Sequence, residues 1–403
     1  MGNPWLTIIG IGEDGLSGLS EASRKALSQA EIVFGGERHL GLADVGARGR
    51  PWPVPFDVSQ VNGQVLDCRG RATVVLASGD PFWHGAGSTL ADRLTSGEWV
   101  AHPAPSTFSL AASRLGWRLE SIVCLGLHAA PFESLMPLLA HGERIICLVR
   151  DGGAAADLAK WLTVHGWGQS LLWTLTALGG LRESITQHAA ESYTGDPNAA
   201  LVAVALEAKG ANGLPRSSGL ADTMFVHDGQ ITKRPIRALA LSALAPRPGE
   251  RLWDIGAGSG SISIEWALHG GIALAVEARS ERVANILTNA NSLGVTHRVE
   301  VIEGTAPDAL RGRPTPQAVF FGGGLDTAMF DRVWPLLVAG TRVVAHAVTL
   351  ETEALLLELH QRHGGDVMRI EISHAGQLGR YRSWEPVRPV VQWSFVKRSG
   401  DGA

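Results

Sequence analysis

The feature that most constrains the fold is a glycine-rich turn that directly follows a short apolar strand. Residues 251–255 are a strand candidate with the apolar residues Leu252, Trp253 and Ile255. Gly256, Gly258 and Gly260 alternate through the next turn before a helical pattern starts at Ser261. Glycine allows a turn to approach a ligand closely and to adopt backbone angles that other residues avoid. A strand, a glycine-rich turn and a helix in this order begin a βαβ unit. This part of the chain is therefore predicted to form a parallel sheet with a ligand-binding turn at its carboxyl edge.

The alternation of short apolar runs and helical patterns continues beyond this turn. Strands and helices that alternate in this way give a mostly parallel sheet with right-handed crossovers, which is an α/β fold. Helices are expected at 236–244, 261–268 and 280–293, and strands at 251–255, 272–276, 299–303, 318–321 and 393–398.

The N-terminal half has an α/β pattern of its own. A polar stretch rich in Gly, Ser, Asp and Pro follows it at 207–230 and indicates a connector. At 403 residues the chain exceeds what one hydrophobic core usually supports. We therefore expect two α/β domains, 1–210 and 231–403, joined by 211–230. In the first domain, strands are expected at 6–10, 31–34, 73–77, 122–125, 144–149 and 200–206, and helices at 21–30 and 106–115.

Charge and cysteine content restrict the partners and the compartment. The formal net charge of −4 provides no basic surface for nucleic acid or for an anionic membrane. Three widely spaced cysteines, Cys68, Cys124 and Cys147, fit neither a disulfide framework nor a zinc site. No apolar window is long enough for a membrane span, and the N-terminus lacks a signal-peptide pattern. We expect a cytoplasmic protein without a metal, nucleic-acid or membrane partner, and we also expect a homo-oligomer.

An acidic residue adds a second element to the C-terminal site. Glu277 ends the second strand about twenty residues after Gly256, where a carboxylate can accept both ribose hydroxyls of a nucleoside. A nicotinamide dehydrogenase has the same layout but needs glycine at the sixth position, which Ser261 occupies here. The order acid-x-Gly-x-Gly-x-Gly from Asp254 onward better fits a nucleoside with a methionine tail, whose ammonium group a helix N-terminus would repel. An S-adenosylmethionine site is favoured over the alternatives, a dinucleotide site and a ligand-free turn.

A literal Gly-x-Gly-x-x-Gly at residues 10–15 does not pass the same test. The next helix begins only near Ser20, so no helix N-terminus faces a pyrophosphate. The strand at 31–34 is followed by Gly35 and offers no acid for a ribose. This motif is therefore not interpreted as a dinucleotide fingerprint.

Two further N-terminal segments place small residues at strand ends. Gly79 and Asp80 follow the strand at 73–77, and Ser106 and Thr107 open the helix at 106–115. Ligands of α/β proteins bind at such strand ends, although each segment alone is also compatible with an ordinary loop.

Taken together, the N-terminal segments resemble the tetrapyrrole methyltransferases of corrin and sirohaem synthesis. That family has a glycine-rich first loop, a Gly-Asp-Pro turn and a Pro-x-x-Ser/Thr helix start. The first loop departs from the usual Gly-x-Gly-Pro-Gly-Asp form, since Glu13, Asp14 and Gly15 follow Gly12. The C-terminal half resembles the decarboxylating precorrin methyltransferases. The matching stretches are 231–237, 254–260, Glu277, 304–310, 321–324 and 350–352.

The two halves in this order resemble the precorrin-6Y C(5,15)-methyltransferases (decarboxylating) of the aerobic cobalamin pathway. The resemblance implies a two-lobed tetrapyrrole methylase domain followed by a Rossmann-like class I methyltransferase domain. It implies that two S-adenosylmethionines are consumed per turnover, that carbons 5 and 15 of precorrin-6B are methylated, and that its carbon-12 acetate is lost as carbon dioxide to give precorrin-8X. Carbon 5 is assigned to the N-terminal domain, and carbon 15 with the decarboxylation to the C-terminal domain. The cofactor residues implied are Thr232, Gly256, Ala257, Gly258, Ser259, Gly260, Glu277 and Ala306 in the C-terminal domain and Gly12, Gly79, Asp80, Ser106 and Thr107 in the N-terminal domain.

A substrate with several carboxylates needs cationic partners. The candidates are Lys233, Arg234, Arg237, Arg380, Arg382 and Arg388, each of which could also be a solvated surface residue. The sequence assigns no catalytic residue, because an electron-rich macrocycle can attack the sulfonium methyl group itself and the protein mainly provides proximity.

Two other functions remain open. RNA base methyltransferases usually have an acid-Pro-Pro-aromatic element after the fourth strand, whereas residues 318–321 run into Gly322, Gly323 and Gly324 here. The acidic charge balance also disfavours a polyanion as substrate. A non-catalytic protein that binds S-adenosylmethionine is the second alternative.

Overall fold

A computed structural model of the chain describes residues 4–53, 57–83, 85–195 and 202–400. Contacts divide the chain into two compact units: 1–132 with 139–212, and 213–403 with 133–138. We describe each unit by itself. Over the described ranges, no helix has the length and apolar character needed to cross a membrane.

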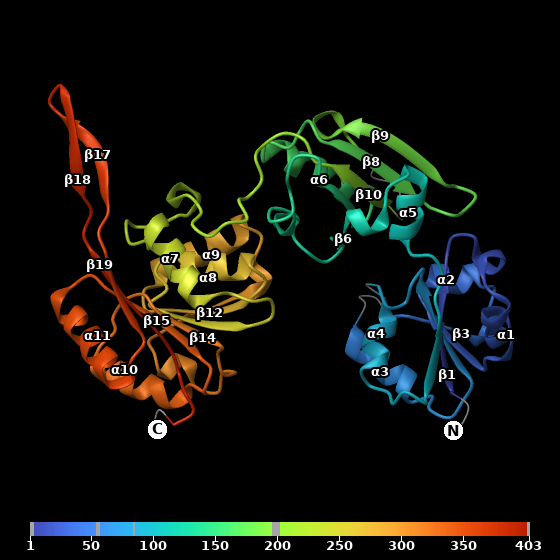
Figure 1. The fold of residues 1–403 in the computed structure, drawn as a ribbon. Helices are drawn as coiled ribbons and strands as arrows, with labels where there is room; N and C mark the ends of the chain where they lie inside the picture. Colours follow the sequence, from blue (N-terminus) through green and yellow to red (C-terminus); the bar gives the residue numbers. More distant parts are fainter. Residues whose placement is uncertain (1–3, 54–56, 84, 196–201, 401–403) are drawn as a thin grey trace. The chain divides into compact units, whose positions relative to one another are not determined.

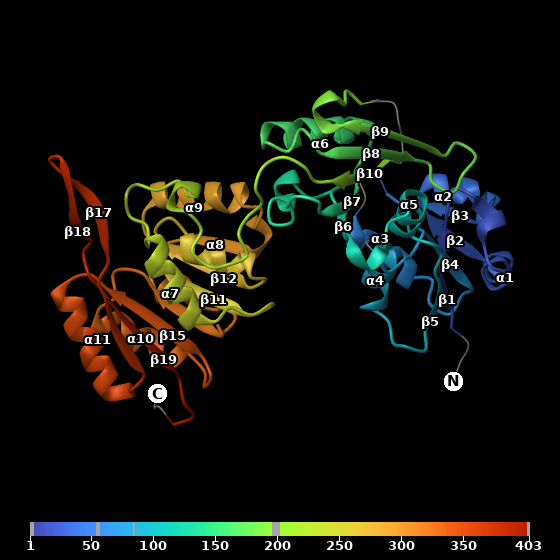
Figure 2. The same cartoon turned by 45° about the horizontal axis from the view of Figure 1, so that its top comes forward.

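The first unit begins with a five-stranded parallel sheet in the order β3-β2-β4-β1-β5 (Figure 1). Its central strands are apolar and buried, with side chains of β1 and β4 facing both sides of the sheet. Helices α1 and α2 cover one face and α3 and α4 the other, which makes this sheet doubly wound (Figure 2). The strands are β1 (Leu6–Ile11), β2 (Ile32–Gly35), β3 (Gly49–Pro51), β4 (Thr73–Ser78) and β5 (Trp99–His102), and the helices are α1 (Glu21–Gln29), α2 (Glu37–Leu42), α3 (Val58–Leu66) and α4 (Ala86–Ala91).

A second sheet of the same unit is mixed, in the order β6-β7-β10-β8-β9. In this sheet β6 and β7 are parallel neighbours, whereas the pairs β7–β10, β10–β8 and β8–β9 are antiparallel. Helix α5 packs on this sheet through Phe108 and Ala111. The elements are α5 (Thr107–Leu115), β6 (Val123–Gly126), β7 (Arg144–Leu148), α6 (Gly152–Val164), β8 (Leu171–Thr176), β9 (Ser184–Ala189) and β10 (Val202–Glu207). The strand expected at 200–206 thus starts at Val202; residues 200 and 201 lie outside the described residues.

The second unit contains one seven-stranded sheet in the order β13-β12-β11-β14-β15-β19-β16. The first five strands of this order are parallel, and β19 runs antiparallel between β15 and β16. The strands are β11 (Arg251–Ile255), β12 (Ile272–Glu277), β13 (Val299–Glu303), β14 (Ala318–Phe321), β15 (Arg342–Ala347), β16 (Asp366–Ile370) and β19 (Val390–Val396).

Helices cover both faces of this sheet. The face with Phe320 and Val344 packs against α7 and α8, and α9 lies next to α8. The opposite face packs against α10 and α11. Helix α8 lies between α7 and α9, so nearly all of its residues are buried and it shows little amphipathic character. The helices are α7 (Arg234–Leu244), α8 (Ser261–Leu268), α9 (Ser280–Ser292), α10 (Thr327–Val333) and α11 (Leu350–His363).

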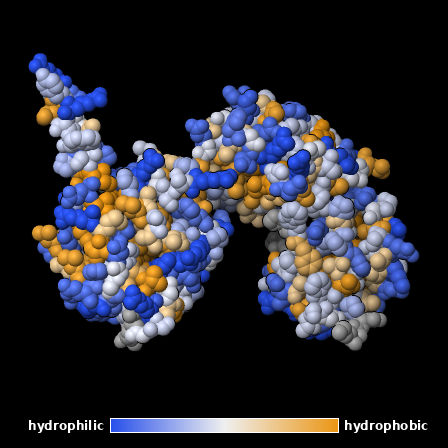
Figure 3. Space-filling view, viewed as in Figure 1, coloured by the Kyte–Doolittle hydropathy of each residue, from blue (hydrophilic) through white to orange (hydrophobic). Residues whose placement is uncertain are grey.

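A hairpin of β17 (Ser373–Leu378) and β18 (Tyr381–Pro386) extends beyond β16 and β19 (Figure 1). Its strands pair only with each other, and Leu378, Tyr381 and Trp384 are exposed. Hydrophobic residues gather at the base of this hairpin, and hydrophilic residues cover its end (Figure 3).

The polar stretch expected to be a connector packs against the second unit from residue 213 onward. Leu220 and Phe225 are buried in the core under α8 and α9. The carboxylate of Glu265 accepts hydrogen bonds from the backbone N–H groups of Gly219 and Leu220 at 2.6 and 3.0 Å. Gly- and Ser-rich composition therefore reflects a turn-rich segment fixed by buried hydrogen bonds, not a free linker.

Candidate functional site

The glycine-rich turn lies between β11 and α8. Gly256, Gly258 and Gly260 all have positive φ, at 73°, 60° and 74°. A Cβ atom on Gly256 would lie 2.6 Å from the carbonyl oxygen of Gly323, and one on Gly260 would lie 2.7 Å from the Ile286 side chain. Glycine is thus required here by backbone angle and by close packing against a second glycine loop.

Two buried polar atoms beside this turn have no hydrogen-bond partner within the described residues: Oγ of Ser259 and Oδ1 of Asp254. Buried polar groups normally find a partner, so these atoms mark a place where a polar ligand fits. The other oxygen of Asp254 accepts hydrogen bonds from the hydroxyl and the backbone N–H of Ser263, at 2.6 and 3.2 Å. Burial raises the pKa of Asp254 to about 7. The hydrogen bonds from Ser263 lower this pKa, and the nearby negative charge of Glu277 raises it further.

Glu277, at the end of β12, is hydrogen-bonded to the glycine-rich turn. Its Oε2 accepts the N–H of Gly258 at 2.8 Å, and its Oε1 accepts the N–H of Arg279 at 3.1 Å. The side chain is buried but lines the cavity described next. The carboxylate therefore keeps free lone pairs toward the cavity while its position is fixed by backbone donors.

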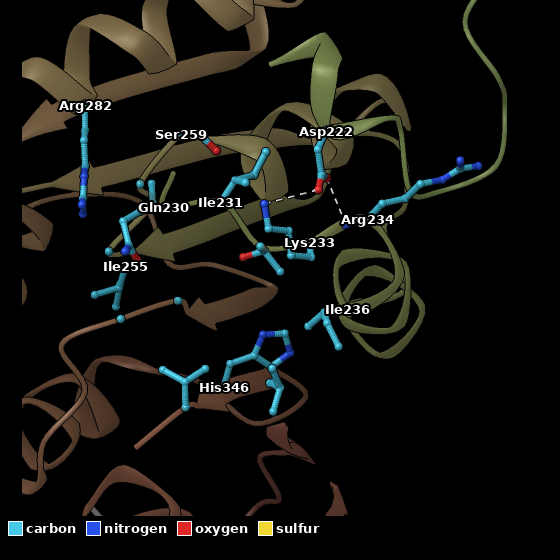
Figure 4. Close-up of a pocket in the computed structure, with 18 of the residues that line it drawn as sticks. Asp222, Gln230, Ile231, Lys233, Arg234, Ile236, Ile255, Ser259, Arg282 and His346 are labelled. Carbon is cyan, nitrogen blue, oxygen red and sulfur yellow. Dashed lines mark hydrogen bonds and ion pairs between the residues drawn. The ribbon is translucent and has the colours of Figure 1, made fainter. Parts of the chain in front are cut away.

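A cavity of about 1440 Å³ lies at the carboxyl ends of β11, β12, β14 and β15 (Figure 4). The predicted residues Thr232, Ala257, Ser259, Glu277 and Ala306 line it. Gly256 and Gly258 do so as well, whereas Gly260 faces Ile286 in the core. The connector contributes further lining residues that the sequence did not indicate, namely Ser218, Gly219, Ala221, Asp222, Thr223 and Gln230.

The cavity wall is more cationic than the chain as a whole. Lys233, Arg234, Arg282 and Arg388 line it, against the carboxylates of Asp222 and Glu277. Lys233 lies 3.8 Å from Asp222 and half of its side chain is exposed (Figure 4). Neither Arg234 nor Arg388 has a side-chain ion pair among the described residues. This excess of positive charge can receive an anionic ligand.

Arg237 was a candidate substrate residue, and the structure contradicts this. Its side chain is fully buried, and it donates to Glu265 at 2.5 Å, to Asp222 at 3.2 Å and to the carbonyls of Thr232 and Leu220. The guanidinium also lies 4.8 Å above the Phe225 ring. All of its donors point into the protein, so Arg237 fixes the segment before α7 and does not line the cavity.

Arg380 and Arg382 were also candidates, and they do not line the cavity either. Arg380 lies in the turn of the projecting hairpin with its guanidinium over Tyr381, and Arg382 lies on exposed β18. The Gly and Pro residues around them lie at the ends of the hairpin strands. From the sequence alone, such a hairpin cannot be distinguished from a loop that folds onto a binding site.

His346 is a cavity residue that the sequence analysis missed. It lies at the end of β15, is 8% exposed, and points toward Lys233 and Ile236 (Figure 4). Its Nε2 lies 3.0 Å from Oε1 of Gln392, and its ring packs edge-on against Phe320. The only available signal was a single polar residue near the end of an apolar run.

In the N-terminal unit, the loops after β1, β4 and β5 come together at one edge of the sheet. The N–H of Gly79 donates to Ile11 at 3.1 Å, and the N–H of Ala104 donates to Gly79 at 3.1 Å. A Cβ atom on Gly10 would lie 1.8 Å from the carbonyl oxygen of Gly79. The neighbouring order β4-β1-β5 of parallel strands explains this convergence.

The remaining N-terminal candidates lie in these loops. Gly12 accepts the N–H of Gly15 in the β1 loop. Asp80 accepts the N–H of Phe82 at 2.9 Å, Ser106 caps α5 by accepting the N–H of Ser109 at 3.1 Å, and Thr107 is the first residue of α5. The structure thus gives Asp80 and Ser106 local roles in their loops while it brings Gly79 next to the β1 loop.

Comparisons with known proteins agree with this architecture. Family profiles match residues 5–187 as tetrapyrrole (corrin/porphyrin) methylases and residues 223–397 as a precorrin methyltransferase domain. A precorrin-6Y C(5,15)-methyltransferase [decarboxylating] from Sinorhizobium sp. is 46% identical over 98% of this chain and 97% of its own. The chain belongs to the precorrin-6Y C(5,15)-methyltransferase family. As methyltransferases, its members take the methyl group from S-adenosylmethionine.

Two further matches cover one part of the chain. A probable cobalt-precorrin-6B C(15)-methyltransferase (decarboxylating) from Pyrobaculum aerophilum is 33% identical over 43% of this chain and 92% of its own. The solved C-terminal domain of precorrin-6Y C5,15-methyltransferase from Rhodobacter capsulatus is 53% identical, covers 46% of this chain and 100% of its own, and has a TM-score of 0.45.

Membership of the precorrin-6Y methyltransferase family confirms the predicted fold class, a tetrapyrrole methylase domain followed by a methyltransferase domain. It also confirms that the chain is a methyltransferase enzyme with a precorrin substrate. The RNA methyltransferase and the non-catalytic binding protein are not supported by these relatives.

Proposed function

We propose that this member of the precorrin-6Y C(5,15)-methyltransferase family transfers methyl groups to carbons 5 and 15 of precorrin-6B, removes its carbon-12 acetate group as carbon dioxide, and releases precorrin-8X. Two S-adenosylmethionines are consumed in each turnover. The names of the relatives support both methylation positions and the decarboxylation.

The observation that carries the proposal for the C-terminal domain is one cavity that joins the glycine-rich turn to a cationic wall. Its volume of about 1440 Å³ exceeds the roughly 300–1,000 Å³ typical of pockets for a single small ligand. The cavity therefore has room for a nucleoside cofactor and part of a large substrate together. Lys233 and Arg388 provide charges for the carboxylates of such a substrate.

The cofactor residues proposed are Thr232, Ala257, Ser259, Glu277 and Ala306, with the turn at 256–260 as the cradle. The unpartnered Oγ of Ser259 and the free lone pairs of Glu277 support this placement. Bound S-adenosylmethionine supplies an electrophilic methyl group. The protein then holds a macrocycle carbon in line with that group, which converts a bimolecular reaction into an oriented one.

The N-terminal domain is proposed to methylate carbon 5. Gly12, Gly79, Asp80, Ser106 and Thr107 lie in loops that meet at the carboxyl ends of β1, β4 and β5, the usual place for a ligand in a parallel sheet. The match of the N-terminal half to tetrapyrrole methylases supports this division of labour.

The proposal also includes a cytoplasmic homo-oligomer that binds no nucleic acid. The three cysteines are unpaired, as suits a reducing compartment, and the net charge of −4 does not suit a polyanion. The exposed apolar side chains of the β17–β18 hairpin support association, and sedimentation velocity tests it.

The mass of precorrin-6B after incubation with the full chain and S-adenosylmethionine tests the proposed reaction. The expected product has gained two methyl groups and lost one carbon dioxide. A product that gains methyl groups and keeps every carboxylate would refute the decarboxylation, and an unchanged tetrapyrrole would refute the proposal as a whole.

A further inference from the structure

The cavity of the C-terminal domain has two chemically different ends. The glycine turn, Ser259 and Glu277 form the polar end. The opposite end is formed by α10, by the last strands of the sheet and by the base of the hairpin. Its apolar lining side chains are Met329, Val348, Ile370, Ile372, Val387 and Val390, and His374 and Arg388 line it beside them.

Strand register places His346 in this apolar end. His346 is opposite Gln392 on β19, and Val390 is opposite Ile370 on β16. Side chains two residues apart on a strand point to the same face, so Val390 lies on the face of Gln392, beside His346. The imidazole thus lies beside aliphatic side chains, and Arg388 and His374 are further polar residues of the same part of the wall.

The partner of His346 determines which nitrogen carries the hydrogen and which one keeps a free lone pair. Oε1 of Gln392 can only accept, so Nε2 of the neutral ring carries the hydrogen and Nδ1 carries the lone pair. Gln392 is 3% exposed, which holds the ring in one orientation. In the described part of the chain, no hydrogen bond uses Nδ1. Burial lowers the pKa of His346 to about 4, partly offset by the bond to Gln392, so the ring is neutral at pH 7.

We propose that His346 is the proton-transfer residue of the decarboxylation, and that the apolar end of the cavity is where the departing carboxylate binds. This inference rests on the proposed function of the C-terminal domain. Arg388 lines the same end and can attract the substrate carboxylate, and the aliphatic side chains of Val348, Ile370 and Val390 suit the neutral carbon dioxide that leaves.

The proton balance gives His346 a definite task. Methyl transfer adds one positive charge to the conjugated macrocycle. The bond between the acetate methylene and its carboxylate then breaks, carbon dioxide leaves, and the bonding pair enters the macrocycle and neutralises that charge. An exocyclic methylene remains, which becomes a methyl group when one proton adds to it and one proton leaves the macrocycle. Nδ1 of His346 accepts the latter proton and donates it to the methylene carbon, with no other reactant needed.

The test is a single-turnover reaction of the full chain with precorrin-6B and S-adenosylmethionine, followed by mass spectrometry. General acid–base catalysis contributes about 10²–10⁴-fold, so His346→Asn is expected to slow decarboxylation at least ~100-fold. Methyl transfer should change less than about threefold, and a methylated tetrapyrrole that keeps all its carboxylates should accumulate. His297→Asn, an exposed histidine of the same domain, is the matched control and should behave as the wild type.

The ratio of the two steps separates catalysis from structure. If His346 had only a structural role, His346→Asn would slow methyl transfer and decarboxylation together, and that result overturns the inference. Unchanged rates of both steps overturn it as well. If the asparagine variant does not fold, Gln392→Leu keeps the imidazole and removes its partner; decarboxylation alone must then slow, and parallel or absent effects refute the role. A wild-type chain that does not convert precorrin-6B refutes the proposed function itself, which is a different failure.

Discussion

Replacement of Arg237 by methionine tests whether this arginine stabilises the domain or binds substrate. The guanidinium is completely buried and pairs with Glu265, whose carboxyl is 1% exposed. Removal of one partner of a buried ion pair costs about 3–5 kcal/mol, because the other charge is left uncompensated. Methionine restores the aliphatic volume but none of the donors to Glu265, Asp222 and the two carbonyls.

Differential scanning calorimetry of the full chain measures this loss. For a unit of this size each kcal/mol shifts the Tm by about 2–4 °C, so the transition of the C-terminal unit should fall by roughly 6–20 °C. Arg380→Met in the exposed hairpin turn is the control and should shift Tm by no more than about 2 °C, as surface substitutions do. Adding Glu265→Gln to Arg237→Met should recover part of the loss, because the second change removes the unpaired charge. A Tm within 2 °C of the wild type, together with a raised KM for the tetrapyrrole, would refute the structural role.

Three further predictions concern the same domain. Glu277→Ala should weaken S-adenosylmethionine binding by about 1.5–3 kcal/mol, the value of a hydrogen bond to a charged group; calorimetric titration that finds unchanged affinity would remove Glu277 from the site. The pKa of Asp254 is about 7 in the native state, whereas an unfolded aspartate has a pKa near 3.9. Between these two pH values the free energy of unfolding should therefore fall as the pH rises, by up to ~1.4 kcal/mol per pH unit. Asp254→Asn should lack this dependence, and a Tm difference between wild type and variant that stays constant from pH 4.5 to 7.5 contradicts the assignment. A fragment that starts at Gly213 should fold, add one methyl group to precorrin-6B and release carbon dioxide, while a fragment ending at Ala211 should only methylate. Release of carbon dioxide only when both fragments are mixed would refute decarboxylation by the C-terminal domain alone.

Elements built largely from apolar residues could be predicted from the sequence. The expected bounds 251–255, 261–268, 299–303 and 318–321 coincide with β11, α8, β13 and β14. Strands β11 and β14 are central in the sheet and α8 packs directly on it, so burial imposes the pattern that the prediction uses, whereas β13 is an edge strand that is only partly buried. The glycine turn was found for the same reason, since its angles and close contacts admit few other residues.

Strands with mostly exposed side chains could not be predicted in this way. Every residue of β18 is exposed, and β9 is exposed along most of its length, so neither shows the alternation of a half-buried strand. Their pairing depends on neighbours that are distant in sequence or on a tight turn. Composition also did not reveal the contacts of 211–230, where backbone N–H groups donate to the side chains of Glu265 and Asn289.

Basic residues were the weakest part of the site prediction. Arg237, Arg380 and Arg388 look alike in sequence, but one is buried in an ion-pair network, one lies on a projecting turn and one lines the cavity. A charge alone does not indicate which of these environments it occupies, because that depends on tertiary contacts.

The place of β19 in the sheet sets the order in which the site can be assembled during synthesis. The glycine turn and Glu277 belong to strands that are translated early in this domain, and His346 follows on β15. The side chain that orients His346, however, is Gln392 on the last strand, which must enter between β15 and β16. A nascent chain that has exposed everything up to the hairpin therefore already contains the cofactor turn but no oriented imidazole. The two halves of the C-terminal chemistry mature at different times, and the proton-transfer half is completed last.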